Sequence, residues 1–338
     1  FVTHPDLFNW HMNELLKNAA QALNEERFKL ILFPTEKCNF RCIYCYESHV
    51  GVRMSLTIVE SIKSFLKLKI PTIKLFELEW FGGEPLLTKD IVIEITSFAK
   101  KMCDAYGVTF VSVMTTNGYL LDFETFEALV QLGVNSFQIT FDGDKENHNQ
   151  YRLSAQSSSL GTFDTIWNNL HNTKKSKEKF AIAIRCHLTA INSGSVRSLL
   201  KKIYSTFGND NRYFIHLKEI SALGGKDDDK MCLLSKEEKK CLIQEIKNEF
   251  SYLQFVDIGK DYICYAAKPN TFAIRADGTI AKCTVALDCE LNNVGRILAD
   301  GSLDINPQKF LLWSQGFDDL DKLKLDCPYY HIIKKYNS

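Results

Sequence analysis

Three cysteines lie within eight residues, in the stretch EKCNFRCIYCYE at 36–47. Cys38, Cys42 and Cys45 have the spacing C-x3-C-x2-C. Thiolates bind soft metals, and a structural zinc or an ordinary iron–sulfur cluster takes four ligands. Three thiolates around a [4Fe–4S] cluster would therefore leave one iron open to a small molecule. Two other interpretations stay open: a zinc ion with its fourth ligand elsewhere, and a set of buried free cysteines.

The amino-acid composition predicts the cellular compartment of the protein and excludes some classes of binding partner. The chain has eleven cysteines in 338 residues and no visible secretory signal. Such cysteines more often bind metal or do chemistry than form disulfides, so we expect a cytoplasmic protein. No apolar run approaches the roughly 20 residues of a membrane span, so no membrane partner is expected. Lys+Arg and Asp+Glu are equal at 41 each, so charge gives no reason to expect nucleic acid.

The cysteine stretch follows the first of six apolar runs that are typical of buried parallel strands. Stretches of helical periodicity alternate with these runs, which predicts a parallel α/β fold. The runs are 28–34, 75–85, 108–118, 135–144, 180–189 and 212–225, and the helices lie at about 55–69, 88–105, 122–132, 161–174 and 195–206. Six units fall short of the eight that close a TIM barrel. We therefore expect an open, partial (β/α)6 TIM-like barrel.

Changes in composition divide the chain into four predicted segments. Helical periodicity at 5–27 predicts an N-terminal helix, and the acid-rich stretch GGKDDDK at 224–230 marks a boundary. A polar helix follows at about 235–250, and short strands around turns then predict a smaller C-terminal domain. The segments are an N-terminal helical segment at 1–27, the barrel at 28–225, a linker helix at 226–258 and the small domain at 259–338.

Polar residues and glycines follow the predicted strands. In a parallel fold the carboxyl ends of the strands are where ligand sites collect. The second run ends in WFGGEP at 80–85, the third in TTNG at 115–118, and the fourth leads into FDGDKENHNQYR at 141–152. Gly82 and Gly83 would let the backbone approach a ligand closely, and Glu84 offers a carboxylate. The alternative is a tight turn at the end of a strand.

With these motifs the sequence resembles the radical S-adenosylmethionine (SAM) enzymes. The signature of that superfamily is a C-x3-C-x2-C loop with an aromatic residue, here Tyr44, before the last cysteine. The resemblance implies a [4Fe–4S] cluster whose open iron binds the amino and carboxylate groups of SAM. It also implies cleavage of SAM to a 5′-deoxyadenosyl radical that abstracts hydrogen from a substrate. An electron donor such as flavodoxin or ferredoxin would be a partner.

The resemblance further implies which residues hold SAM. The Gly-Gly-Glu-Pro segment would contact the methionine amino group, and polar residues after later strands would line the adenosine and substrate pocket. Arg185 would reach the methionine carboxylate or the ribose. The implied residues are Tyr44, Gly82, Gly83, Glu84, Pro85, Thr116, Asn117, Asp142 and Arg185. As alternatives, Asp142 and His148 would cap and order a turn, and Arg185 would lie at the surface or the edge of the core.

A second group of cysteines lies toward the C-terminus. Cys264, Gly278 and Cys283 have the spacing C-x13-G-x4-C, which resembles the opening of a SPASM or twitch domain. Such domains carry auxiliary [4Fe–4S] clusters. A complete SPASM domain continues with four more cysteines. When these four positions are aligned with the C-terminal residues of this chain, only Cys327 is a cysteine. We therefore expect one auxiliary cluster. The implied ligands are Cys264, Cys283 and Cys327, with Cys289 as a further candidate or an ordinary small hydrophobic residue.

Enzymes with SPASM or twitch domains mostly modify peptides or proteins, and residues 264–286 look like those of maturases for ribosomally made peptides. We therefore expect a maturase that abstracts hydrogen from a precursor peptide and forms a thioether or carbon–carbon crosslink. Three alternatives stay open. An anaerobic sulfatase-maturing enzyme would carry Asp where this chain has Thr284. The others are a twitch dehydrogenase of a small metabolite and a non-catalytic iron–sulfur protein.

Overall fold

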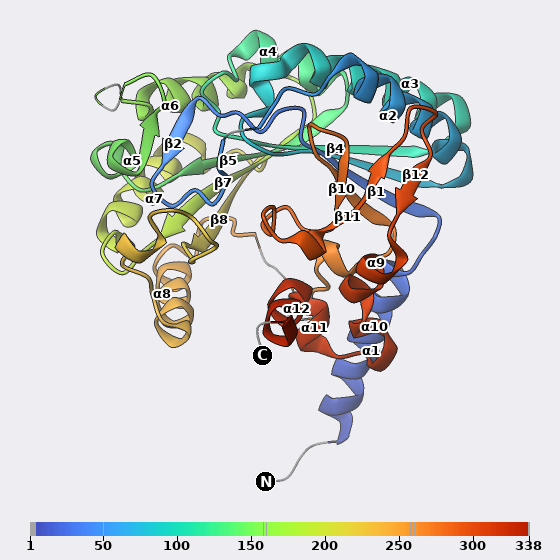
Figure 1. Ribbon diagram of the computed structural model, residues 1–338. Helices are drawn as coiled ribbons and strands as arrows, with labels where there is room; N and C mark the ends of the chain where they lie inside the picture. The colour runs from blue at the N-terminus through green and yellow to red at the C-terminus, as the bar shows by residue number, and fades with distance from the viewer. Residues whose placement is uncertain are drawn as a thin grey trace.

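The computed structural model describes residues 5–49, 51–157, 159, 161–256, 259 and 261–336. Residues 1–4 of the predicted N-terminal segment, 257–258 of the linker, and 260 and 337–338 of the C-terminal domain lie outside the described residues. Figure 1 shows a broad sheet with most helices on one side and the C-terminal segment on the other. In the described part of the chain, no helix is both long and apolar enough to cross a membrane.

Six parallel strands form the barrel, and each coincides to within one residue with part of one of the predicted apolar runs. They are hydrogen-bonded side by side in chain order. The strands are β1 (Arg27–Leu32), β3 (Leu75–Trp80), β4 (Thr109–Thr116), β5 (Val134–Phe141), β7 (Ala181–Leu188) and β8 (Tyr213–Glu219). The predicted partial (β/α)6 barrel is confirmed.

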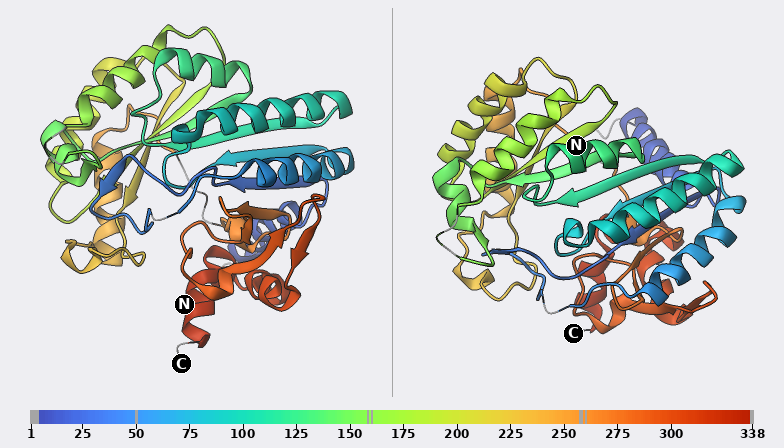
Figure 2. Two further views of the ribbon diagram at one scale, coloured as in Figure 1. Left: turned by 45° about the horizontal axis from the view of Figure 1, so that its top comes forward. Right: turned by 90° about the horizontal axis from the view of Figure 1, so that it is seen from above.

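Helices cover the outer face of this sheet (Figure 2). The predicted helices are present as α2 (Leu56–Lys69), α3 (Lys89–Tyr106), α4 (Phe123–Gln131), α6 (Phe163–Asn172), α7 (Ser193–Phe207) and α8 (Lys236–Glu249). Local side chains fix several of their starts: Ser55 caps α2, Asp122 caps α4, and Ser235 forms a capping box with Glu238 in α8. The core between sheet and helices includes Trp80, which is fully buried.

Three short elements near the cysteine stretch were not predicted. They are β2 (Phe40–Cys42), α5 (Lys145–Tyr151) and β6 (Arg152–Ser154). Strands β2 and β6 pair antiparallel, with Cys42 opposite Arg152. Strands of three residues are too short to produce a periodic pattern, so only the folded chain brings them together.

The C-terminal segment continues the barrel sheet. Strand β9 (Thr271–Ile274) pairs parallel with β1, and β10 (Thr279–Ala281), β11 (Asn293–Ile297) and β12 (Leu303–Ile305) extend the sheet with antiparallel pairing. Four helices follow: α9 (Pro307–Ser314), α10 (Gly316–Asp319), α11 (Lys322–Asp326) and α12 (Pro328–Tyr336). The predicted boundary at 259 stays a prediction, and the ten-stranded sheet runs across it.

Helix α1 (Pro5–Ala22) packs on the C-terminal segment, on the concave side of the sheet (Figure 1). Leu15, Ala19 and Ala22 of α1 form a small apolar cluster with residues of the C-terminal segment, which include Ile263 and Leu325. The two ends of the described chain are thus held together by burial of apolar surface.

One ion pair joins the cysteine stretch to β9. Arg275 Nε donates to Glu36 Oε1 at 2.7 Å, and a terminal nitrogen of Arg275 donates to Glu36 Oε2 at 2.8 Å. Arg275 also donates to the carbonyl oxygen of Leu287 at 3.0 Å. Two-point pairing of guanidinium and carboxylate is geometrically restrictive, so this clamp fixes the start of the cysteine loop relative to the C-terminal segment.

Arg275→Met should lower the free energy of unfolding by about 1–2 kcal/mol, because it leaves the half-buried Glu36 carboxylate without its partner. Urea denaturation followed by tryptophan fluorescence measures this loss. Glu36→Gln should cost a similar amount, and the double variant less than the sum, because both changes remove one interaction.

Lys100→Met is the control, since it removes an exposed (i, i+4) pair with Asp104 that contributes only about 0.3–0.5 kcal/mol. A loss for Arg275→Met no larger than that for Lys100→Met would contradict the clamp.

Candidate functional site

The cysteine loop lies at the carboxyl end of β1 and is fixed along its length. Pairing of β2 with β6 anchors its middle, and Ile43 N donates to the carbonyl oxygen of Tyr151 at 3.0 Å. Cys45 N donates to the carbonyl oxygen of Cys42 at 3.0 Å, which turns the loop back on itself. Cys38, Cys42 and Cys45 are all free thiols of partly buried residues.

All three thiol residues line one cavity of about 170 Å³ at the carboxyl ends of the strands. Of the other residues predicted to bind SAM, Tyr44, Gly83, Thr116, Asn117 and Arg185 also line it. Gly82, Glu84, Pro85 and Asp142 are not among its lining residues. The cavity is further lined by Gln138, Thr140, His187 and Glu219, which the sequence analysis did not select. Period-two alternation along β5 and β7 could have found several of them, since His187 shares a strand face with Arg185.

The thiols of the loop lie close enough to affect one another. Burial, the Cys42 thiol and Glu47 together raise the pKa of Cys45 to about 12. Burial, Glu84 and the neighbouring thiols raise the pKa of Cys38 as well. A metal centre would stabilise the thiolates, and an all-sulfur donor set suits zinc or an iron–sulfur cluster.

Within the described residues, no three His, Cys, Asp or Glu side chains converge as the ligands of one metal ion. A four-iron cluster is wider than a single ion and is held by thiolates that lie further apart. Three thiols around one cavity therefore fit the cluster that the sequence analysis predicted.

The Gly-Gly turn packs directly on the cysteine loop. Gly82 and Gly83 have φ values of +79° and +44°, in the left-handed region. A Cβ atom on Gly83 would lie 2.1 Å from the carbonyl oxygen of Lys37, and one on Gly82 would lie 2.0 Å from the Phe33 ring. Glu84 N donates to that same Lys37 oxygen at 2.9 Å. Only glycine permits this contact between the two loops.

Glu84 links the second strand-end loop to the third. Its fully buried carboxylate accepts hydrogen bonds from Thr116 Oγ1 at 2.8 Å, Asn117 N at 2.7 Å and Leu86 N at 3.0 Å. Burial raises its pKa although these donors favour the charged form. Both oxygens are therefore engaged by the chain itself, and Glu84 positions the loops. Its contact with the methionine amino group stays a prediction.

Tyr44 is held by a buried network that the sequence analysis found only in part. Its hydroxyl donates to Asp142 Oδ2 at 2.6 Å and accepts from Arg152 at 2.6 Å. His187 Nδ1 lies 2.9 Å from Asp142 Oδ1. Burial opposes ionisation of Asp142, yet His187 and Arg152 hold its pKa well below the usual range. His148 Nδ1 accepts from Asp142 N at 3.4 Å, so both residues order this turn.

Arg185 stands in contrast to this network. Within the described part of the chain, its guanidinium makes no hydrogen bond or ion pair, and its Nε is buried without a partner. Burial lowers its pKa, yet the nearby Tyr44, Tyr46 and Asp142 favour its charged form. A buried unpaired cation that lines a cavity indicates an anionic ligand such as a carboxylate.

The C-terminal cysteines also gather. Burial and the nearby Cys283 and Cys327 thiols raise the pKa of Cys264 to about 12. Tyr329 lies among Cys289, Cys283 and Cys327, whose charges add to burial in raising its pKa. The four predicted auxiliary ligands thus lie in one region, and their role as ligands stays a prediction.

Asn292 fixes the main chain around one of these cysteines. Its Oδ1 accepts from Cys283 N at 2.8 Å, and its Nδ2 donates to the carbonyl oxygen of Cys283 at 2.8 Å. Asn292 is 2% exposed, so this two-way contact is shielded from water. The position of the Cys283 thiol is therefore set by a side chain that sequence spacing does not indicate.

The family comparison agrees with this geometry. Residues 32–187 match the model of the Radical SAM superfamily. The match includes the cysteine loop, the Gly-Gly turn and Arg185. Residues 32–187 therefore carry a radical SAM domain, which confirms the superfamily recognised from the sequence.

Curated relatives match part of the chain. The Fe-coproporphyrin III synthase of Methanosarcina barkeri is 27% identical over 173 residues, which are 49% of this chain and 37% of that protein. The cysteine-type anaerobic sulfatase-maturating enzyme of Clostridium novyi is 28% identical over 201 residues, which are 55% of this chain and 49% of that protein. The chain thus spans less than half the length of each relative.

Solved structures match more of the chain. Native anSMEcpe with bound AdoMet has a TM-score of 0.63 at 20% identity, over 84% of this chain and 80% of that chain. Streptococcus suis SuiB bound to precursor peptide SuiA has a TM-score of 0.58 at 13% identity, over 86% of this chain and 67% of that chain. At these identities the likeness shows the fold alone.

Gly83→Ala should lower the free energy of unfolding by about 2–4 kcal/mol, because the new methyl group meets a backbone oxygen and the φ value is unfavourable for alanine. Gly107→Ala is a matched control. Gly107 also has a positive φ, of +66°, but nothing lies within 4 Å of its added Cβ, so only about 1 kcal/mol should be lost. Urea denaturation measures both, and equal losses would contradict the tight contact of the loops.

Asp142→Asn should cost about 3–5 kcal/mol, because it leaves the buried Arg152 without an anion. The same denaturation assay measures the loss. Asp164→Asn is the control, since Asp164 makes an exposed pair with Lys145 at 2.6 Å and should cost at most about 1 kcal/mol. If the two variants unfold at the same urea concentration, the Tyr44 network does not contribute as described.

Proposed function

We propose that this protein is a radical SAM maturase that forms a thioether or carbon–carbon crosslink in a precursor peptide. The observation that carries the proposal is the cavity in which three free thiols and one unpaired guanidinium meet at the carboxyl end of the barrel. That combination suits an iron–sulfur cluster together with a ligand that has a carboxylate.

Cys38, Cys42 and Cys45 would hold three irons of a [4Fe–4S] cluster, with the fourth iron open to SAM. Arg185 would pair with the SAM carboxylate, because it is the lining cation that lacks a partner. The backbone at Gly83 would lie beside the amino group. Bound together, the cluster and SAM supply a 5′-deoxyadenosyl radical, which abstracts a hydrogen atom from the substrate.

The second group of cysteines supports peptide modification over a simpler reaction. A crosslink forms when the substrate loses a second hydrogen as a proton and an electron. Cys264, Cys283 and Cys327, with Cys289, would hold one auxiliary cluster that accepts this electron or anchors a substrate thiol. Because β9 pairs with β1, the sheet holds this group in a fixed position relative to the cysteine loop.

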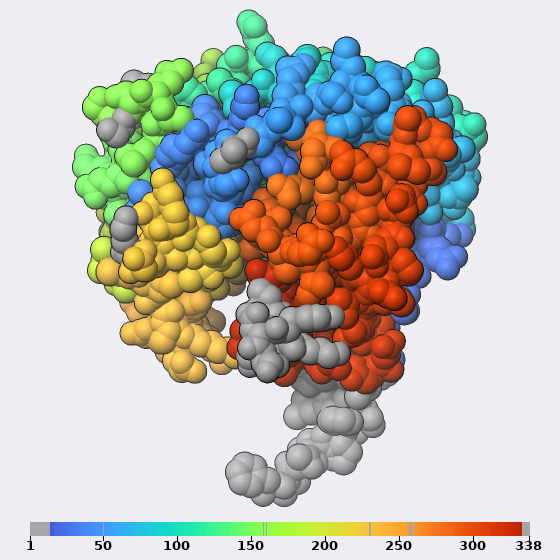
Figure 3. Space-filling view, viewed as in Figure 1, coloured from blue at the N-terminus to red at the C-terminus, as the bar shows by residue number. Residues whose placement is uncertain are grey.

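A larger recess next to the cavity suits a peptide. It measures about 480 Å³ and is lined by the cysteine loop, by Gly224 at the end of the barrel, by Lys226 and Asp227 of the linker, and by Asp288 of the C-terminal segment. Figure 3 shows the linker in yellow and the C-terminal segment in orange facing each other, with the blue cysteine-loop segment above them. A dehydrogenase of a small metabolite would instead need a closed cavity.

Two structures with the same fold hold peptides, which supports the same class of substrate here. SuiB binds its precursor peptide SuiA, and anSMEcpe binds the peptide Kp18Cys. The proposal includes an electron donor such as flavodoxin or ferredoxin. It also includes a cytoplasmic location, since all eleven cysteines are free and clusters need a reducing compartment.

Sulfatase maturation is the second candidate, because a curated relative carries that activity in its name. The residue after Cys283 argues against it. Thr284 offers no carboxylate to act as a base, and its hydroxyl lies 2.7 Å from the Tyr265 hydroxyl. The Asp expected of that family is therefore absent from this position.

The test is incubation of anaerobically reconstituted, reduced protein with SAM and the small peptide encoded beside its gene. We expect 5′-deoxyadenosine and a peptide whose mass is lower by two hydrogen atoms. Iron analysis should give about eight irons per chain, and about four in Cys264→Ala.

Matched variants separate the two thiol groups. Cys38→Ala should abolish 5′-deoxyadenosine formation, whereas Cys264→Ala should keep it and lose the crosslink. Cys241→Ser changes an exposed cysteine outside both groups and should behave as the unaltered protein. No 5′-deoxyadenosine, or zinc in place of iron in the loop, would refute the proposal.

A further inference from the structure

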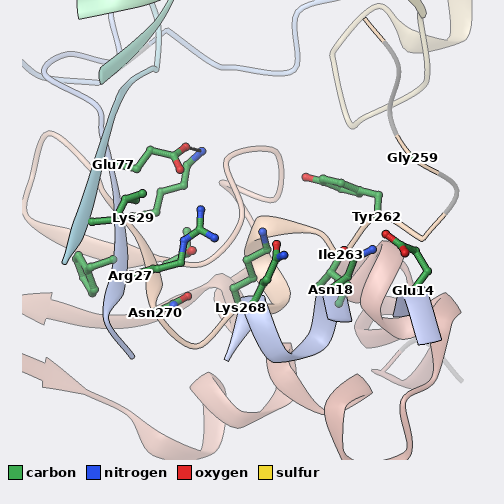
Figure 4. Close-up of a pocket in the computed structure, with 14 residues that line it drawn as sticks. Glu14, Asn18, Arg27, Lys29, Glu77, Gly259, Tyr262, Ile263, Lys268 and Asn270 are labelled. Carbon is green, nitrogen blue, oxygen red and sulfur yellow. Dashed lines mark hydrogen bonds and ion pairs between the residues drawn. The ribbon is translucent and has the colours of Figure 1, made fainter. Parts of the chain in front are cut away.

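A second cavity lies at the opposite end of the barrel from the cysteine loop (Figure 4). It measures about 380 Å³. Its walls come from α1, from the first residues of β1 and β3, and from residues further along the chain: Gly259, Tyr262, Ile263, Lys268, Asn270 and Thr271. Neither the family match nor the proposed SAM site accounts for this cavity, because the SAM-binding edge lies at the other end of the same strands.

Three cations line the cavity: Arg27, Lys29 and Lys268. Lys29 is already neutralised, since its Nζ lies 2.5 Å from Glu77 Oε1 and 2.6 Å from Glu79 Oε2. Strands β1 and β3 are in register here, with Lys29 opposite Glu77, so the pairing follows from the sheet. Glu77 and Glu79 both pair with Lys29, so neither carboxylate pairs with Arg27 or Lys268.

Arg27 and Lys268 have no such partner. Across the residues that the structure describes, neither side chain makes a hydrogen bond or an ion pair with another group. Figure 4 shows the polar ends of Arg27, Lys268 and Tyr262 directed toward the same space. The remaining lining carboxylate, Glu14, lies 3.9 Å from the Lys17 ammonium on α1. Among the described lining residues, Arg27 and Lys268 are therefore the two charges without a direct partner, beside a Lys29–Glu77–Glu79 triad that carries one net negative charge.

The position of Lys268 makes this charge unfavourable without a ligand. Lys268 is half-buried, whereas Arg27 is exposed. Burial and the like charges of Lys29 and Arg27 lower the pKa of Lys268, and the charge of Glu77 opposes that shift. Two cations that face one space repel each other, and an anion between them would remove that repulsion. A carboxylate is an anion that Arg and Lys both bind by charge-assisted hydrogen bonds.

One face of β3 runs from this cavity toward the cavity of the cysteine loop. Glu77, Glu79 and Phe81 alternate on that face, with Glu77 lining the second cavity and Phe81 the first. The four steps from Glu77 to Phe81 along the strand span about 13 Å at about 3.3 Å each. An extended peptide covers the same distance in about four residues.

We propose that Arg27 and Lys268 bind an acidic side chain of the peptide substrate, about four or more residues from the residue that reacts. The identity of this ligand as the substrate rests on the proposed function; the anion site itself rests on the two unpaired cations. The site would hold an acidic segment of the peptide while the reacting residue enters the cysteine-loop cavity.

The test uses fluorescence anisotropy with the full chain and two labelled, C-terminally amidated hexapeptides, one of glutamate and one of glutamine. We expect the glutamate probe to bind and the glutamine probe to bind at least about tenfold more weakly. Arg27→Gln/Lys268→Gln should weaken binding of the glutamate probe about tenfold or more. Lys101→Gln/Lys240→Gln removes the same charge from exposed positions elsewhere and should change binding less than about twofold.

Equal binding of the two probes, equal binding by the two double variants, or no binding of the glutamate probe would overturn the proposal. The assay contains no SAM and no reductant. A protein that binds the glutamate probe but forms no 5′-deoxyadenosine would therefore refute the proposed function and not the anion site. A protein that forms 5′-deoxyadenosine but does not bind the glutamate probe would refute only the anion site.

Discussion

The contact between two backbone turns is the constraint on which the site depends. The Gly82–Gly83 turn approaches the carbonyl oxygen of Lys37 so closely that no side chain fits between them. The buried Glu84 carboxylate then ties this turn to the end of β4. Three strand-end loops thereby form one rigid wall, and the thiols of the cysteine loop take their positions from it.

The charged residues around the cavity fall into two kinds. Some hold other residues of the site in position, and others are free to bind a ligand. Asp142 is fully buried and bonded to Tyr44 and His187, so it stabilises the position of Tyr44 and has no oxygen to spare for a ligand. Among the described residues, the partly exposed Arg185 has no partner, and its Nε is buried. A buried charge without a partner is costly in a folded protein, which makes Arg185 the residue to expect opposite a ligand carboxylate.

The ten-stranded sheet sets the position of the C-terminal cysteines relative to the cysteine loop. β9 adds to the free edge of β1, and the Glu36–Arg275 pair fixes that junction close to the first cysteine loop. An auxiliary centre held on this extension would keep a constant distance from the barrel cavity. Such rigidity suits a reaction in which a second electron leaves the substrate after the first hydrogen is removed.

The sequence by itself determined the six strands, the helices between them and the cysteine loop, because these depend on local periodicity and on spacing within one segment. It also indicated Gly83, Asn117 and Arg185 as residues of the cavity. It did not show that Glu84 and Asp142 are engaged by the chain's own donors, or that Arg152 and His187 complete the Tyr44 network. Nor did it show that Arg27 and Lys268 line one cavity, where neither has a partner among the described residues. Hydrogen bonds and ion pairs between residues far apart in the chain exist only after the strands are in register, and so only the tertiary structure decided them.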